Sequence, residues 1–158
     1  MLEGHCLCGK VRYEIDGALG PVVQCHCSMC RRASGSAFAT NASVDAKAFR
    51  IVAGRKSIKT YKSSKDGTRN FCRRCGSPVF GTVKAAPQIV RIRLGLLENA
   101  DGARPAAHVW TGSKADWDEI DATLKQFDEA PPPDFVMPGA SAKKPKKAAT
   151  KKTKRTKK

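Results

Sequence analysis

Residues 4–15 read GHCLCGKVRYEI, in which two cysteines one residue apart lead into an alternating run of apolar and charged side chains. Val11, Tyr13 and Ile15 occupy every second position, which is the period of a half-buried β-strand. The other five cysteines lie in two further groups, CHCSMC at residues 25–30 and CRRC at residues 72–75. Every cysteine therefore has a close partner, and this grouping indicates how the chain folds.

Zinc sites account for cysteines at such short spacing, and the competing explanations are disulfides, an iron–sulfur cluster or buried apolar thiols. The N-terminal residues carry no basic segment followed by an apolar run, so we expect no export to an oxidising compartment. No apolar stretch approaches the ~18 residues that span a bilayer, and we expect a cytoplasmic protein. Iron–sulfur ligation stays open, although no run matches the four-cysteine ferredoxin pattern closely. Zinc is favoured because it prefers tetrahedral sulfur coordination.

Seven cysteines divide into one site of four and one of three, and we expect two zinc ions per chain. Four protein ligands close a zinc ion off for structure, whereas three leave a position for water or substrate. Pairing Cys6 and Cys8 with Cys72 and Cys75 would tie the N-terminus to a segment about 65 residues later and stabilise a small domain. The spacing of Cys72 and Cys75 predicts a tight knuckle turn, with Gly76 where a positive φ is often needed. Spacing alone leaves the alternative that this pair completes the middle group.

Strand geometry offers an explanation for the one-residue spacings. Residues i and i+2 of an extended segment face the same side, so Cys6 and Cys8 can reach one metal ion. Cys25 and Cys27 repeat this arrangement and turn His26 outward. For His26 we expect a structural or supporting role, and for His108 an ordinary structural one.

Short strands dominate the expected secondary structure, which makes the fold class mainly β. We expect strands over residues 10–15, 21–24, 36–40, 49–52, 57–61, 78–83 and 88–94, separated by Gly and Pro turns. Helix is scarce, with short helical turns expected over residues 28–33, 45–49 and 116–124, the second of them capped by Ser43.

The formal net charge of +16 comes mostly from the C-terminus. Residues 139–158 hold ten basic residues and no acidic or aromatic ones, whereas residues 1–138 hold 20 basic and 14 acidic residues. We expect a folded zinc-binding domain over residues 1–135 and a disordered Lys-rich tail over residues 136–158. Such a tail would bind nucleic acid nonspecifically and in a salt-dependent way.

Four stretches of this chain together resemble the glutathione-dependent formaldehyde-activating enzyme family, also called the centromere protein V-like family. They are GHCLCGKVRYEI at residues 4–15, CHCSMCRRASGSAF at 25–38, FCRRCGSPVF at 71–80 and HVWTGSKADW at 108–117. The resemblance covers roughly residues 3–130 and implies a tent-shaped fold of small antiparallel β-sheets with two zinc sites. The basic tail is not part of the family pattern.

The same resemblance implies a role for each group of cysteines. The first and last pairs, Cys6, Cys8, Cys72 and Cys75, would hold a structural zinc ion. The trio of Cys25, Cys27 and Cys30 would hold a catalytic one. The implied activity is addition of glutathione to formaldehyde to give S-hydroxymethylglutathione, which is classed with the carbon–sulfur lyases by its reverse reaction.

Three thiolates suit thiol chemistry, because the Zn²⁺ site they form carries a net charge of −1 and accepts a soft thiolate as fourth ligand. Arg31 and Arg32 directly follow the trio, and we expect them either to bind substrate carboxylates or to form a solvated basic face. The alternative function is a noncatalytic zinc-binding domain that delivers the basic tail to nucleic acid.

Overall fold

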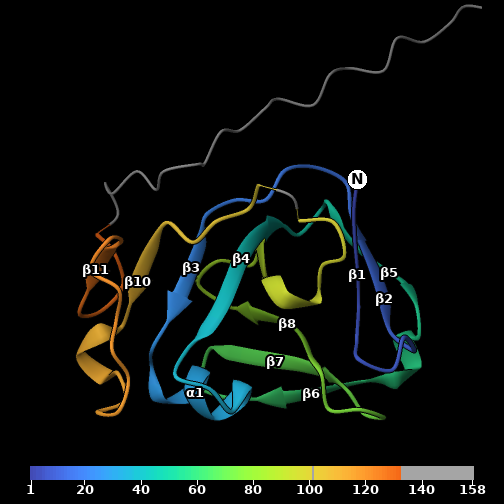
Figure 1. The fold of residues 1–158 in the computed structure, drawn as a ribbon. Helices are drawn as coiled ribbons and strands as arrows, with labels where there is room; N and C mark the ends of the chain where they lie inside the picture. The colour runs from blue at the N-terminus through green and yellow to red at the C-terminus, as the bar shows by residue number, and fades with distance from the viewer. Residues whose placement is uncertain (101, 133–158) are drawn as a thin grey trace, which may run out of the picture.

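Two β-sheets form the framework of the computed structural model, in which residues 1–100 and 102–132 are described (Figure 1). The smaller sheet has the strand order β1 (Leu2–His5), β2 (Arg12–Ile15), β5 (Phe49–Ala53). The larger sheet has the order β11 (Lys125–Phe127), β10 (Ala107–Val109), β3 (Val22–Cys25), β4 (Ala39–Asp45), β9 (Ile89–Arg93), β8 (Pro78–Val83), β7 (Gly67–Cys72), β6 (Ile58–Lys62).

Most neighbouring strands run antiparallel, which confirms the mainly β prediction. The exception is β10, which pairs in parallel with β3 on one side and with β11 on the other. Its Val109 lies opposite Cys25, so the C-terminal part of the described chain is placed against the middle group of cysteines.

Seven of the strands overlap segments predicted from the sequence, although β4 shares only Ala39 and Thr40 with the segment predicted over residues 36–40. Four others were missed: β1, β7, β10 and β11. Two of these have only three residues, and β7 reads GTRNFC, whose polar residues hide the period of a half-buried strand.

The structure contains one α-helix among the described residues, α1 (Ser28–Ser34), where a helical turn was predicted. Three short 3₁₀ helices are also present in the described residues: η1 (Arg55–Ser57), η2 (Leu94–Leu96) and η3 (Thr111–Ser113).

The helical turn predicted over residues 116–124 is wrong. The carboxylates of Asp116 and Asp121 accept hydrogen bonds from the backbone N–H groups of Trp117 and Thr123, and such local bonds compete with a helix. At residues 45–49 the chain makes a turn closed by Ala48 N–H to Asp45 O, and Ser43 lies within β4 rather than at a cap.

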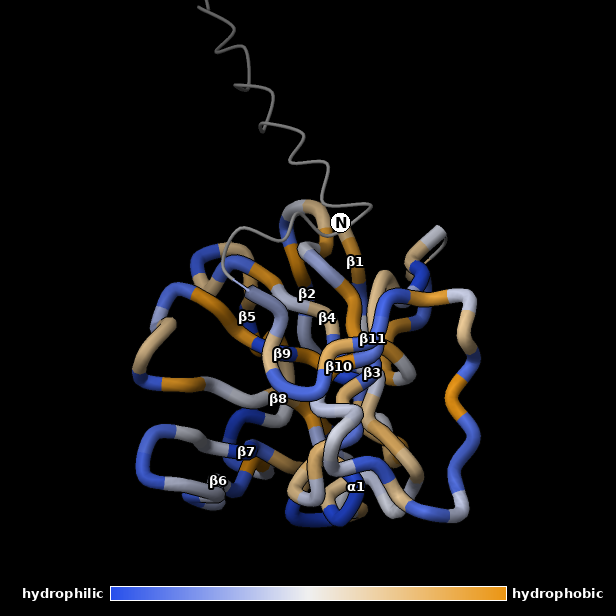
Figure 2. Tube along the Cα trace, turned by 90° about the vertical axis from the view of Figure 1, so that its left-hand side faces the viewer, coloured by the Kyte–Doolittle hydropathy of each residue, from blue (hydrophilic) through white to orange (hydrophobic). Residues whose placement is uncertain are grey.

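The main core lies between the two sheets, and β5 is one of the strands drawn mostly in orange, the colour of hydrophobic residues, in Figure 2. Tyr13 of β2 stacks on Phe49 of β5 at 5.3 Å between ring centroids, and Phe49 meets Phe80 of β8 at 5.1 Å. These rings join the small sheet to the large one.

A second, smaller cluster lies on the other face of the large sheet. Along β4, Ala42 and Val44 enter the main core, whereas Ala39 packs with Cys25, Cys30 and Val109. Side chains that alternate along β4 therefore place the main core on one face of the large sheet and the middle group of cysteines on the other.

The connection between β5 and η1 depends on Gly54. Its φ is +70°, and a Cβ at this position would lie 2.0 Å from the backbone oxygen of Lys10. Gly35, at the C-terminal end of α1, also has a positive φ of +61° but has open space around it.

We therefore expect the Gly54→Ala and Gly35→Ala substitutions to differ in cost, measured by urea unfolding of the metal-loaded protein. Gly35→Ala should lose about 1 kcal/mol because alanine disfavours a positive φ, and Gly54→Ala about 3 kcal/mol because a backbone clash adds to that cost. Equal losses would mean that the close approach to Lys10 does not constrain the fold.

Candidate metal centres

The four sulfur atoms of Cys6, Cys8, Cys72 and Cys75 converge, all lying within 4.8 Å of one another. Sγ of Cys8 lies 3.6 Å from Sγ of Cys6 and 3.9 Å from Sγ of Cys72. Tetrahedral zinc with ~2.3 Å bonds to sulfur places its ligand atoms about 3.8 Å apart. The donor set and its spacing therefore fit a closed zinc site, and Cys72 and Cys75 do not join the middle group.

Two turns present these four sulfur atoms. Gly76 N–H donates to Cys72 O at 2.8 Å and has a φ of +78°, as the knuckle prediction requires. The extended geometry expected for Cys6 and Cys8 is wrong. The chain turns after β1, with Gly9 N–H donating to Cys6 O at 2.8 Å, because Gly9 adopts a φ of +68°.

Ser77 supports the four-cysteine group, a role that the sequence did not reveal. Its hydroxyl accepts from Leu7 N–H at 2.9 Å and lies 3.4 Å from Cys75 Sγ. Val11 N–H donates to Cys6 Sγ at 3.2 Å. Donors of this kind stabilise sulfur in its thiolate form, which is the form that binds metal.

The second convergence joins Cys25, Cys27 and Cys30, whose sulfur atoms also lie within 4.8 Å of one another. Cys25 ends β3, Cys27 caps α1 and Cys30 lies in its first turn, where Cys30 N–H donates to Cys27 Sγ at 3.4 Å. Cys25 and Cys30 are buried and Cys27 is half-buried. Three sulfur donors fit a zinc site with one position left for another ligand.

Two arginines that the sequence analysis passed over lie beside this trio. Nη2 of Arg69 from β7 lies 3.9 Å from Cys30 Sγ. Arg93 of β9 interacts electrostatically with Cys30 and Cys25 and donates a hydrogen bond to Asn41 Oδ1 of β4. The sequence predicted the strand that carries Arg93 but not β7, and it did not reveal the pairing that brings both strands to the trio.

The charges around the trio favour one thiolate. Hydrogen bonds from Cys25 and Cys27, with Arg69 acting in the same direction, hold the pKa of Cys30 well below its usual range. Hydrogen bonds with Cys27 and Cys30, and then burial, raise the pKa of Cys25. Arg69 therefore favours a thiolate at Cys30, and a metal ion that binds all three sulfurs must displace the remaining protons.

Arg31 and Arg32, predicted as substrate contacts, differ in their surroundings. The guanidinium of Arg31 donates to His26 O and to Ser113 O, each at 3.3 Å, and so ties α1 to the chain after β10. Arg32 is exposed. Their binding of substrate stays a prediction.

His26 points away from the trio but not into solvent, because it is fully buried. Its Nε2 lies 2.9 Å from His108 Nδ1, and its Nδ1 lies 3.3 Å from Asp118 Oδ2. The second contact has the distance of an ion pair without hydrogen-bond alignment. Burial lowers the pKa of both histidines. The burial of His26 agrees with the structural role expected for it, and the strand that covers it is β10, which supplies His108.

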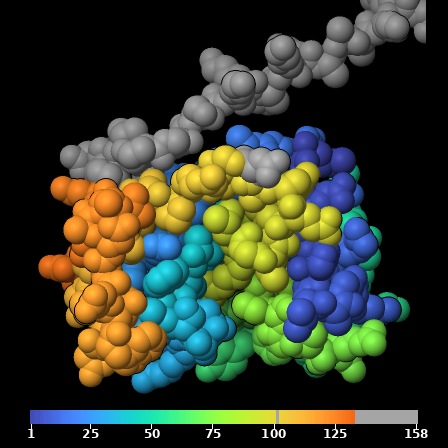
Figure 3. All heavy atoms as spheres, in the orientation of Figure 1, coloured from blue at the N-terminus to red at the C-terminus, as the bar shows by residue number. Residues whose placement is uncertain are grey.

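In the space-filling view of Figure 3, the orange C-terminal part of the described chain lies beside the cyan residues of α1 and β4. This arrangement agrees with the contacts that Arg31 and His26 make to residues 108–118. Residues well after the last cysteine also reach the three-cysteine site, since Val109 and Phe127 pack in the same cluster as its cysteines.

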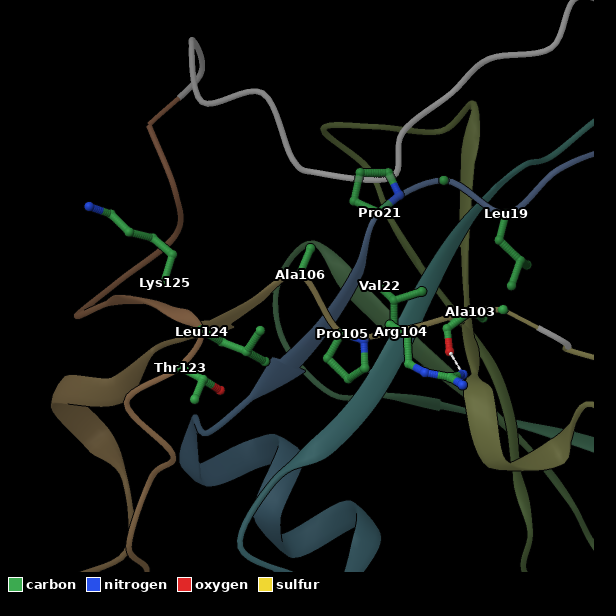
Figure 4. Close-up of a pocket in the computed structure, with 12 residues that line it drawn as sticks. Leu19, Pro21, Val22, Ala103, Arg104, Pro105, Ala106, Thr123, Leu124 and Lys125 are labelled. Carbon is green, nitrogen blue, oxygen red and sulfur yellow. Dashed lines mark hydrogen bonds between the residues drawn. The ribbon is translucent and has the colours of Figure 1, made fainter.

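A cavity of about 470 Å³ lies elsewhere, between the start of β3 and the segment before β10. Figure 4 shows Pro21, Val22, Pro105 and Leu124 lining it. It contains no cysteine, so its size does not make it the chemical site.

Residues 1–113 match the protein family described as glutathione-dependent formaldehyde-activating enzyme, and the match includes all seven cysteines. The chain belongs to this family. A protein of Halomonas elongata named "Putative glutathione-dependent formaldehyde-activating enzyme" is 33% identical over 131 residues, which cover 77% of this chain and 82% of that protein.

A crystal structure of a Rhodobacter sphaeroides protein has a similar fold, with a TM-score of 0.55 and 27% sequence identity. The similarity covers 65% of this chain and 91% of that one. Among residues 1–100 and 102–132 of the family member described here, no helix is long and apolar enough to cross a membrane.

The buried histidine pair predicts a pH effect on stability. Because folding lowers the pKa of His108, protonation favours the unfolded chain, and stability should fall as the pH drops below the unfolded value of about 6.5. A His108→Gln variant should lose about 1–3 kcal/mol at pH 7.5, since it leaves His26 without its partner.

Urea unfolding of both proteins between pH 7.5 and 5 tests this effect, because metal release in acid is common to both. The stability advantage of the wild type should shrink as the pH falls. A constant or growing advantage would contradict the buried neutral pair.

Proposed function

We propose that this family member is a zinc-dependent enzyme that forms or cleaves the carbon–sulfur bond of a thiol–aldehyde adduct such as S-hydroxymethylglutathione. The observation that carries the proposal is the convergence of Cys25, Cys27 and Cys30 while the other four cysteines form a separate group. Three donors leave a coordination position that four donors would fill.

A zinc ion held by this trio would supply a positively charged partner that keeps an incoming thiol deprotonated. A free thiol with a pKa of ~8.5 is only a few per cent ionised at pH 7, so full ionisation is worth roughly 30-fold, or about 2 kcal/mol. This gain is modest beside the accelerations of about a millionfold or more that enzymes reach. Positioning of the aldehyde must supply the rest.

In the proposed reaction the thiolate sulfur attacks the aldehyde carbon. A carbon–sulfur bond forms as the carbonyl π bond opens, and the oxygen takes up a proton to become the hydroxyl group. The reverse reaction breaks the same bond. Arg69 and Arg93 offset the negative charge that three cysteine thiolates and a substrate thiolate bring together.

The four-cysteine group would hold a second zinc ion for structure. Its Cys6 and Cys72 are fully buried and belong to the main core, so a metal ion there would contribute its binding free energy to folding.

The two groups should therefore respond differently to substitution. Cys72→Ser should unfold the domain, whereas Cys27→Ser should leave it folded with one zinc ion in place of two. Circular dichroism and metal analysis by mass spectrometry of purified protein measure both effects. A soluble, folded Cys72→Ser protein with unchanged thermal stability would contradict the structural role.

Exchange NMR of formaldehyde with glutathione tests the reaction itself. The wild type should raise the exchange rate above the rate in buffer, Cys27→Ser should abolish the increase, and Arg12→Gln should retain it, because Arg12 is exposed on the small sheet. A wild-type rate equal to that in buffer would overturn the proposal.

The predictions of a Lys-rich tail and of its contact with nucleic acid concern residues 136–158, which lie outside the described residues. They stay predictions, as does the domain boundary at residue 135. Deleting residues 139–158 should lower retention on DNA if the tail is the binding element, and unchanged retention would exclude it.

A further inference from the structure

Three arginines lie on the face of the large sheet that carries Cys25. Residues paired directly across neighbouring strands project to the same side of a sheet. Asn41 of β4 pairs with Arg93 of β9, and Arg91 pairs in turn with Gly81 of β8. The same Gly81 pairs with Arg69 of β7.

The other face of these strands is already used. Val90 and Ile92, which alternate with the arginines along β9, are buried in the main core. The arginines must therefore face away from that core, on the side where Ala39 packs against Cys25 and Cys30. Because Gly81 has no side chain, nothing on β8 at that position separates Arg91 from Arg69.

In the described part of the chain, these guanidinium groups form no ion pair with an acidic residue. The ion pairs found within residues 1–100 and 102–132 join His5 to Glu98, His26 to Asp118 and Arg50 to Glu14. None includes Arg69, Arg91 or Arg93. Arg69 instead approaches Cys30 Sγ, Arg93 donates to Asn41, and Arg91 is exposed. Arginine stays charged at neutral pH, so the row carries positive charge that no carboxylate of the described chain balances by an ion pair.

The charge of the proposed reaction accounts for two of these arginines. Three cysteine thiolates around Zn²⁺ give a net charge of −1, and a substrate thiolate makes it −2. Arg69 and Arg93 lie nearest to that charge. Arg91 shares its cross-strand row with Arg69 through Gly81, but it is exposed and remains available for an anion on the substrate.

We propose that Arg69, Arg91 and Arg93 form an anion-binding row that selects thiols bearing carboxylate groups. Arg69 and Arg93 compensate the thiolate centre, and Arg91 binds a substrate carboxylate. This assignment rests on the proposed function, because it takes the three-cysteine site to be where the thiol enters. It makes the substrate class an anionic peptide thiol, of which glutathione with its two carboxylates is an example.

Calorimetric titration of the zinc-loaded full-length protein tests the role of Arg91, with glutathione and its diethyl ester as the two probes. The wild type should bind glutathione about tenfold more tightly than the ester, as expected for an arginine–carboxylate contact. The Arg91→Gln substitution should lower the affinity for glutathione about tenfold and leave the affinity for the ester unchanged. Arg12→Gln, the control on the small sheet, should behave as the wild type.

Competition with a chromophoric chelator tests the other two arginines without measuring activity. Arg69→Gln and Arg93→Gln should release the more weakly held zinc ion several-fold more readily than Arg91→Gln does, because they remove charge next to the thiolates. Equal release from all three variants would overturn the division of roles.

The outcomes separate this inference from the proposed function. If the wild type accelerates adduct formation but binds glutathione and its ester equally, the anion-binding row is wrong and the reaction stands. The opposite result has two parts: the wild type binds glutathione more tightly than the ester and Arg91→Gln abolishes this difference, but the wild type does not accelerate adduct formation. In that case the anion-binding row stands and the proposed reaction is wrong.

Discussion

The convergence of four sulfur atoms from the two ends of a 64-residue interval is the constraint on which the rest of the structure depends. The turn after β1 and the knuckle after β7 belong to different sheets, and their cysteines meet at one point. A metal ion there would close this interval and add its binding free energy to folding. The main core consists largely of β-branched residues and three aromatic rings in contact, and Cys6 and Cys72 belong to it. A metal ion bound by these cysteines would therefore also hold the core together.

The large sheet separates structure from chemistry by its own alternation. One face contributes Val44, Val90 and Ile92 to the main core. The other face carries Cys25 of β3 and, two and four strands away, the arginines of β9 and β7. Because successive side chains of a strand point to opposite faces, the cysteine and the arginines lie on one face of the sheet and the apolar residues on the other.

Much of this arrangement was predictable from the sequence. The cysteine groups, the knuckle at residues 72–75 and most of the longer strands follow from local patterns, and the family follows from the resemblance of four stretches of the sequence. Arg69 and Arg93 could not be assigned, because their approach to Cys30 depends on the order β4-β9-β8-β7 in the sheet. Arg31, adjacent in sequence, bonds to backbone carbonyls. The burial of His26 was missed for the same reason, since β10 joins β3 from 82 residues away.

The central claim is that seven sulfur ligands are divided four and three between two zinc ions. X-ray absorption at the zinc edge of the metal-loaded protein measures the ligands directly. The account predicts an average of about 3.5 sulfur atoms per zinc at about 2.3 Å, with two zinc ions per chain and one light ligand at every second zinc. A single zinc ion per chain, or a shell with fewer than three sulfur atoms per zinc, would contradict it.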